Sequence, residues 1–183
     1  MRKTMMLLAT VGAMLLLVSG VALAAVINGT SGADTLRGTD GADTIRGYAG
    51  EDTMFGNRGP DTMYAGPDRD AVYGGNGADT MYGEGLRDSM YGGYDNDKMY
   101  GGEGIDVIEG EFGFDRIYGG SGSDRIDGGP RGDRINVADG EFDSVSCGSG
   151  PEADTAVIDQ ADLSQQSFED FVRLSSCENV TVR

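Results

Sequence analysis

Histidine and tryptophan are absent from this 183-residue sequence, and cysteine and proline are scarce, with two and four residues. Without histidine the chain cannot form a Ser-His-Asp triad or the H-E-x-x-H zinc site of metalloproteases. Basic residues are also few, since 14 lysines and arginines face 31 acidic residues and the net charge is −17. Such a surface repels nucleic acid and anionic lipid and attracts cations. We therefore predict a cation-binding protein that is not an enzyme and binds no nucleic acid.

The N-terminal segment has the organisation of an export signal. Met1-Arg2-Lys3 precedes an apolar run from Met5 to about Val18, and Ala22-Leu23-Ala24 is a small-residue cleavage pattern. The alternative is a membrane anchor, but the apolar run is shorter than the roughly 20 residues that span a bilayer. We predict that residues 1–24 are a signal peptide, that the mature chain is secreted, and that no segment inserts into a membrane after cleavage.

The only two cysteines, Cys147 and Cys177, lie in the C-terminal part of the chain. In an exported protein two cysteines are most simply one disulfide bond. It would close a loop of about thirty residues, worth ~3 kcal/mol in the chain-entropy model. Zinc binding is the alternative, and it is disfavoured because the sequence has no histidine and no C-x-x-C motif.

A nine-residue pattern occurs twelve times in phase between Gly29 and Asn136, without insertion or deletion. Glycine holds the first position in every repeat except the one that opens with Ala65, and the fourth position in eight of the twelve. The eighth position is always aliphatic or methionine: Leu36, Ile45, Met54, Met63, Val72, Met81, Met90, Met99, Ile108, Ile117, Ile126 and Ile135. The sixth is always aspartate: Asp34, Asp43, Asp52, Asp61, Asp70, Asp79, Asp88, Asp97, Asp106, Asp115, Asp124 and Asp133.

This pattern resembles G-G-x-G-x-D-x-U-x, the RTX or hemolysin-type calcium-binding nonapeptide repeat. The resemblance covers more than half of the chain and implies an all-β fold, a right-handed parallel β-roll. Two repeats make one coil of such a roll, so each repeat lies above the next but one, with one inward side chain per repeat. The expected organisation is a signal peptide (1–24), the β-roll (25–136), and degenerate repeats with a small disulfide-closed cap (137–183).

The same resemblance implies several calcium ions bound by the twelve sixth-position aspartates, with backbone carbonyls from the glycine-rich turns. Stacking would place Asp34 over Asp52 at about one strand spacing, ~4.8 Å. Two carboxylates at that distance repel by roughly 3 kcal/mol at an effective dielectric constant near 20, so a cation is needed between them. Calcium suits such oxygen cages better than magnesium. The alternative is that these aspartates only cap turns.

The turns differ from one another in sequence. Asp68, Leu86, Asp95 and Arg131 replace the fourth-position glycine. Arg69 and Arg87 precede ligand aspartates, so the middle turns are expected to bind calcium weakly or to use an arginine as a counter-charge. The strongest sites are expected between Asp34 and Asp52, Asp43 and Asp61, and Asp106 and Asp124.

Aromatic side chains recur at the outward ninth position: Phe55, Tyr64, Tyr73, Tyr82, Tyr91, Tyr100 and Tyr118. They predict one stacked ladder on each sheet, which stiffens the roll. The alternative is a surface that binds carbohydrate.

After Asn136 the nine-residue phase is lost. Asp143 with Val145, and Asp154 with Val157, keep a similar pattern at longer spacing. Residues 167–174 predict a short helix, and residues 179–182 a final strand. Terminal caps of this kind close the last layer of a repeat array.

The function that these features favour is a secreted calcium-binding protein whose β-roll folds on binding extracellular calcium. One alternative is a structural or adhesive cell-surface spacer that binds carbohydrate or matrix. A remote alternative is a carboxylate-based polysaccharide-degrading enzyme.

Overall fold

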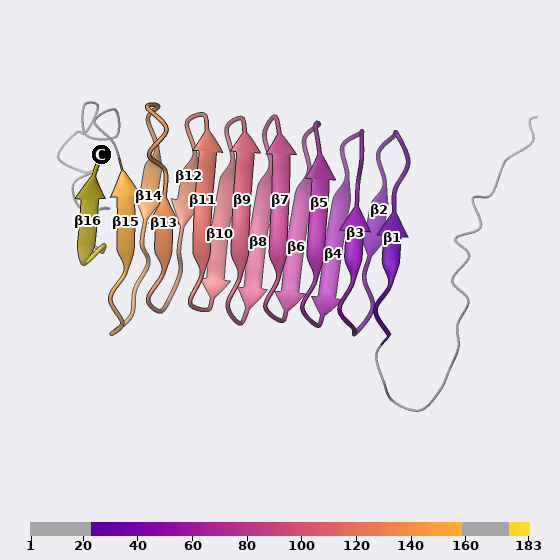
Figure 1. Ribbon diagram of the computed structural model, residues 1–183, viewed down its shortest axis with the longest axis horizontal. Helices are drawn as coiled ribbons and strands as arrows, with labels where there is room; N and C mark the ends of the chain where they lie inside the picture. The colour runs from indigo at the N-terminus through magenta and orange to yellow at the C-terminus, as the bar shows by residue number, and fades with distance from the viewer. Residues whose placement is uncertain (1–22, 159–175) are drawn as a thin grey trace, which may run out of the picture.

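The computed structural model describes residues 23–158 and 176–183, which form two layers of short parallel strands (Figure 1). The nine-stranded sheet contains, in spatial order, β1 (Val26–Asn28), β3 (Thr44–Arg46), β5 (Thr62–Gly66), β7 (Thr80–Gly85), β9 (Lys98–Glu103), β11 (Arg116–Ser121), β13 (Arg134–Asn136), β15 (Thr155–Ile158) and β16 (Asn179–Val182). The seven-stranded sheet contains β14 (Ser144–Ser146), β12 (Arg125–Asp127), β10 (Val107–Phe112), β8 (Ser89–Tyr94), β6 (Ala71–Asn76), β4 (Thr53–Arg58) and β2 (Thr35–Arg37). The predicted all-β parallel solenoid is confirmed.

Successive strands alternate between the two sheets, so neighbours within a sheet are two repeats apart. Ile45 pairs with Met63, and Met63 pairs with Met81, a step of eighteen residues each time. Turns join the sheets along the two long edges of the roll (Figure 1). This register places identical repeat positions directly above one another, so every column of the roll is made of one position of the repeat.

The core is a single file of side chains between the sheets. Side chains at successive strand positions point to opposite faces, so the eighth position faces inward and the seventh and ninth face outward. The eighth-position residues are all buried, from Leu36 at 9% exposed to Ile135 at 1%. The core is therefore thin, and it receives one large side chain from each repeat.

The C-terminal strands continue both sheets. Strand β14 pairs with β12, and β15 pairs with β13. The disulfide between Cys147 and Cys177 is present, and residues 179–182 form the expected final strand, β16. Residues 1–22 and the expected helix at 167–174 lie outside the described residues. No helix long and apolar enough to cross a membrane occurs in residues 23–158 and 176–183.

The sequence pattern groups Asp154 with Val157, but the inward residue after Asp154 is Ala156, which pairs with the core residue Ile135 and is fully buried. Val157 faces outward instead and pairs with Asn136. The inward position stays two residues after the aspartate because the strand begins directly after Asp154, as strands do after the other sixth-position aspartates.

The outward aromatic residues form the two predicted ladders. Phe55, Tyr73 and Tyr91 stack on the seven-stranded sheet, with centroids 5.0 and 4.9 Å apart. The second ladder, on the nine-stranded sheet, has 4.9 Å between neighbouring ring centroids and consists of Tyr64, Tyr82, Tyr100 and Tyr118. An arginine covers the first ring of each ladder, Arg37 over Phe55 and Arg46 over Tyr64. A further stacked pair that the repeat pattern does not predict, Tyr94 and Phe112, lies at the strand ends.

Three of the four residues that replace the fourth-position glycine keep the backbone conformation of glycine. Leu86, Asp95 and Arg131 have φ values of 62°, 79° and 99°. Aspartate tolerates this region, whereas a residue with a larger side chain is strained there by ~1–2 kcal/mol. The turn therefore keeps its backbone conformation even where the residue at the fourth position disfavours a positive φ.

Replacing Leu86 with glycine is expected to stabilise the calcium-loaded protein by up to about 1 kcal/mol, because the released strain exceeds the ~0.5–1 kcal/mol entropic cost of glycine. Chemical denaturation measures the change in the free energy of unfolding. Leu86→Ala is the control, since it trims the exposed side chain but keeps the Cβ atom that causes the strain. An equal gain in the alanine variant would show that side-chain exposure, and not backbone conformation, is responsible.

Candidate metal centre

The twelve sixth-position aspartates form two columns, one along each long edge of the roll. Each aspartate directly precedes a strand, because the turn ends at the sixth position and the strand starts at the seventh. The column that leads into the seven-stranded sheet consists of Asp34, Asp52, Asp70, Asp88, Asp106 and Asp124. The column that leads into the nine-stranded sheet consists of Asp43, Asp61, Asp79, Asp97, Asp115 and Asp133. All except Asp34 are at most 5% exposed.

One oxygen of each carboxylate holds the neighbouring turn in place. The backbone N–H of Asp79 donates to Oδ1 of Asp97 at 2.8 Å, and the N–H of Asp97 donates to Oδ1 of Asp115 at 2.8 Å. The same bond joins Asp34 to Asp52, Asp43 to Asp61, and Asp106 to Asp124, the three pairs expected to form the strongest sites. Each carboxylate from the second one onward in a column is therefore fixed in orientation by the turn that precedes it.

The second oxygen has a different environment. In Asp34 and Asp43, Oδ2 accepts hydrogen bonds from the N–H groups of Thr30 and Thr39. In the other ten aspartates Oδ2 is buried and has no hydrogen-bond partner: Asp52, Asp61, Asp70, Asp79, Asp88, Asp97, Asp106, Asp115, Asp124 and Asp133. Buried polar oxygens of this kind are rare unless a ligand satisfies them, so the unpaired atoms identify two rows of incomplete sites.

The first-position glycine leaves space beside each unpaired oxygen. A Cβ atom built on Gly92 would lie 2.6 Å from Oδ2 of Asp97 and 2.5 Å from the carbonyl oxygen of Gly110, one turn further along the column. Only a residue without a side chain leaves a carboxylate oxygen and a carbonyl oxygen facing the same small space. Ala65 is the one exception at the first position, and its methyl group reduces this space in the repeat of Asp70.

Burial makes the charged form of these carboxylates unfavourable in the protein alone. It raises the pKa of Asp61, Asp70, Asp106 and Asp115 to about 6. The pKa rises to about 7 in Asp79 and Asp124, and to about 8 in Asp88, Asp97 and Asp133. In most of these residues the charges of neighbouring aspartates raise the pKa further. A compensating positive charge is therefore required if the columns are to be ionised at neutral pH.

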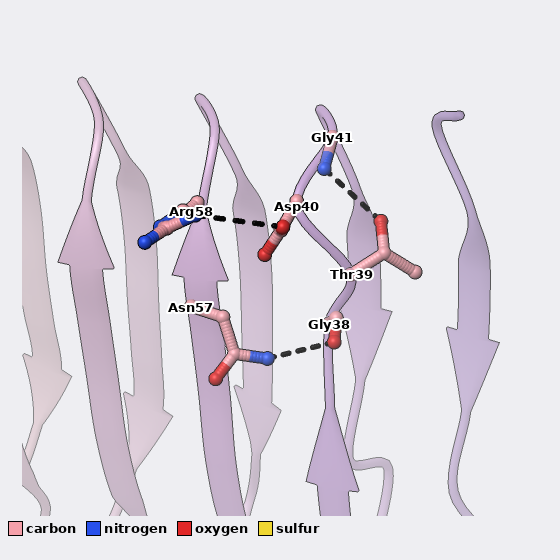
Figure 2. A network of polar contacts seen from close by, with 6 residues as sticks. All are labelled: Gly38, Thr39, Asp40, Gly41, Asn57 and Arg58. Atoms are coloured by element: carbon pink, nitrogen blue, oxygen red, sulfur yellow. Dashed lines mark hydrogen bonds and ion pairs between the residues drawn. The ribbon is translucent and has the colours of Figure 1, made fainter. Parts of the chain in front are cut away.

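Basic side chains do not supply this charge. Within residues 23–158 and 176–183, the one ion pair joins Arg58 and Asp40 at 3.7 Å, and both side chains are exposed. Figure 2 shows this pair between the end of β4 and the turn that follows β2, where Asn57 also donates to the carbonyl oxygen of Gly38 at 2.7 Å. Arg87 lowers the pKa of Asp106, which lies in the next turn of the column, but not the pKa of the adjacent Asp88.

The oxygen atoms on each edge suit a hard cation that accepts carbonyl ligands. Across the described ranges no group of three or more His, Cys, Asp or Glu side chains is arranged to hold a metal ion by side chains alone. Any ion in the columns would thus combine aspartate oxygens with backbone carbonyls, which calcium accepts readily and zinc does not. The unpaired Oδ2 atoms and the glycine-lined spaces fit such an ion.

Two aspartates outside the twelve repeats also join the columns. Oδ1 of Asp143 accepts the N–H of Asp124, and Oδ1 of Asp154 accepts the N–H of Asp133. The sequence marks both as remnants of the repeat, but the in-phase pattern does not place them among the site residues, because insertions change the spacing to ten and eleven residues. An aspartate two residues before a buried apolar residue would have identified both, as Val145 and Ala156 are buried.

Comparison with protein-family models gives four matches to the RTX calcium-binding nonapeptide repeat, at residues 28–63, 56–89, 73–108 and 100–135. Together they cover more than half of the chain, which therefore belongs to the RTX calcium-binding nonapeptide repeat family. A search of curated proteins finds no significant match.

Proposed function

We propose that this protein is a secreted calcium-binding protein whose β-roll folds when it binds extracellular calcium. The observation that carries the proposal is the row of buried Oδ2 atoms without hydrogen-bond partners on each edge of the roll. The family to which the chain belongs supports calcium as the ion.

The ligands would be the twelve sixth-position aspartates together with carbonyl oxygens of the turns. Calcium held by these residues would supply positive charge and offset the repulsion of about 3 kcal/mol between each pair of neighbouring carboxylates. Oδ1 of every sixth-position aspartate except Asp34 already accepts a backbone N–H, so Oδ2 is the oxygen available to the ion in the ten aspartates where it has no hydrogen-bond partner. The turn of Asp70 is expected to bind less tightly because of the methyl group of Ala65.

Folding and binding are expected to be one event. The core receives one large side chain from each repeat, so it is thin and the roll needs a further source of stability. Ion binding confined to the folded state provides it.

An extracellular location supports this mechanism. The N-terminal segment has the pattern of a signal peptide, and the disulfide between Cys147 and Cys177 is typical of oxidising compartments. Calcium at the millimolar concentrations found outside cells saturates even weak sites. The role is binding and not catalysis, because the conspicuous carboxylates already hold turns in register.

Circular dichroism of the mature chain tests the proposal. In chelator we expect a largely disordered spectrum, and addition of millimolar calcium is expected to produce the β-sheet signal, with heat of binding in parallel calorimetry. Magnesium at the same concentration is the control and is expected to have little effect. A β-sheet spectrum that persists in excess chelator, with no metal detected in the protein, would disprove the proposal.

A further inference from the structure

Three cationic side chains gather on one outward face of this strongly acidic protein. Lys98, Arg116 and Arg134 occupy the seventh position of alternate repeats and begin strands β9, β11 and β13. The sheet register places them directly beside one another, with Arg116 in the middle. All three are exposed, and none forms an ion pair among the described residues. We call these three residues the cationic column.

Stability of the fold does not explain the cationic column. Like charges at neighbouring register positions destabilise a sheet, and the 31 acidic residues of the chain offer ample neutralising partners. The seventh and ninth positions of the nine-stranded sheet nevertheless contain no acidic residue. The acidic side chains on these strands, Glu84 and Glu103, lie at the far strand ends, beyond the tyrosines.

The opposite sheet provides an internal comparison. Its seventh position carries a single cation, Arg125, between Val107 and Ser144, and its ninth position includes the acids Glu109 and Asp127. The same repeat therefore produces a mixed surface on one sheet and an unneutralised positive surface on the other. Of the two sheets, the nine-stranded sheet therefore presents the surface suited to an anion.

A second row of polar groups runs parallel to the cationic column. Tyr100, Tyr118 and Asn136 follow the three cations by two residues on the same strands, about 6.6 Å further along. The stacked rings are 4.9 Å apart, so they cover one another's faces and leave ring edges and hydroxyl groups at the surface. Hydroxyl and amide groups both donate and accept hydrogen bonds.

We propose that the cationic column and the adjacent tyrosine row bind a polyuronate, an acidic polysaccharide with one carboxylate on each sugar ring. A polyuronate chain that lies along the roll axis advances by roughly one strand spacing, ~4.8 Å, per sugar ring, so the carboxylates on the side that faces the protein come within reach of the long side chains of the cationic column. The guanidinium groups of Arg116 and Arg134 match a planar carboxylate with two parallel hydrogen bonds. The sugar hydroxyl groups then face the tyrosine hydroxyls and the Asn136 amide.

Calorimetry with the calcium-loaded mature chain and a short oligouronate tests this proposal. The wild-type protein is expected to bind the oligouronate, to bind it less tightly at high salt, and not to bind a neutral glucan of equal length. The triple variant K98Q/R116Q/R134Q is expected to lose about tenfold in affinity, as three exposed ion pairs are removed. Arg125→Gln is the matched control at the same repeat position on the other sheet, and its affinity should stay within about twofold of wild type.

A calcium ion that bridged the protein to the oligouronate would produce binding without the cationic column. Such a bridge would act equally in wild-type and triple-variant protein, so unchanged affinity in the triple variant overturns the proposal. Tighter binding of a sulfated oligosaccharide, equal binding of the neutral glucan, or no binding at all also overturns it. Folding on calcium is recorded separately, so a roll that folds but ignores the oligouronate refutes this inference alone.

Removal of like-charge repulsion should leave the triple variant at least as heat-stable as wild type. If the triple variant does not acquire the calcium-dependent β-sheet spectrum, Arg116→Gln alone decides the question. Its expected loss of affinity is about threefold, and wild-type affinity in that single variant overturns the proposal.

Discussion

Replacement of Asp97 with asparagine is expected to destabilise the calcium-loaded roll and to stabilise the calcium-free roll. Asparagine retains an oxygen that can accept the N–H of Asp79, which Oδ1 of Asp97 accepts at 2.8 Å. It removes the negative charge that calcium needs, and removal of one partner from a buried charge pair costs ~3–5 kcal/mol. Without calcium the same charge is a liability, because burial raises the pKa of Asp97 to about 8.

Two measurements detect the expected loss of stability with calcium and the expected gain without it. Chemical denaturation at saturating calcium gives the loss of stability, and titration with a protecting osmolyte in chelator gives the gain, since osmolytes promote folding without supplying charge. Glu103→Gln is the control, because it makes the same charge change in an exposed residue outside the aspartate columns. It should change the free energy of unfolding by no more than about 0.5 kcal/mol in either condition.

Effects of the same sign in both conditions would contradict the interpretation of Asp97. A loss in chelator as well as in calcium would mean that the aspartate acts mainly through its backbone hydrogen bond. Asp97→Ala separates the two contributions, since it removes the hydrogen bond and the charge together.

The sequence alone predicts the parts of this fold that depend on period. A repeat of nine residues with an apolar residue at position eight determines which residues lie inside, and a coil of two repeats determines which residues stack. The core file from Leu36 to Ile135, both aromatic ladders and the stacking of Asp34 over Asp52 all follow from those two facts. The confirmed disulfide follows from the number of cysteines and the export signal.

Features that depend on individual atoms are not predictable in this way. A period shows that two aspartates stack, but not that one oxygen accepts a backbone N–H while the other stays unpaired. The positive φ of Leu86 also escapes prediction, because a leucine in place of glycine suggests a changed turn and the neighbouring turns instead impose the original one. The inward place of Ala156 is not identified from the sequence either, because insertions break the nine-residue spacing.

The charge difference between the two sheets is only partly predictable from the sequence. Lys98, Arg116 and Arg134 are eighteen residues apart and look unrelated in the sequence. They become neighbours only when alternate repeats are assigned to one sheet. The pattern is therefore present in the sequence, but its meaning depends on the pairing.

Acidification in the absence of calcium is expected to promote folding of the roll. Nine buried carboxyls have a pKa raised by burial to between about 6 and about 8, whereas an unfolded aspartate has its ordinary value near 3.8. Between these values the folded chain binds more protons than the unfolded chain, so stability rises as pH falls from 8 towards 5. All nine groups act in the same direction, so protonation favours the folded chain at each of them.

Circular dichroism in chelator between pH 8 and pH 5 measures this effect and stays above the isoelectric point of about 4.1. The β-sheet signal is expected to increase as pH falls. At a calcium concentration that just saturates the protein at pH 8, the β-sheet signal is instead expected to decrease as pH falls, because protons compete with calcium for the same carboxylates. If acid instead disorders the calcium-free chain over this range, the carboxylates are neutralised by some means other than protons or calcium, and the electrostatic basis of the calcium requirement fails.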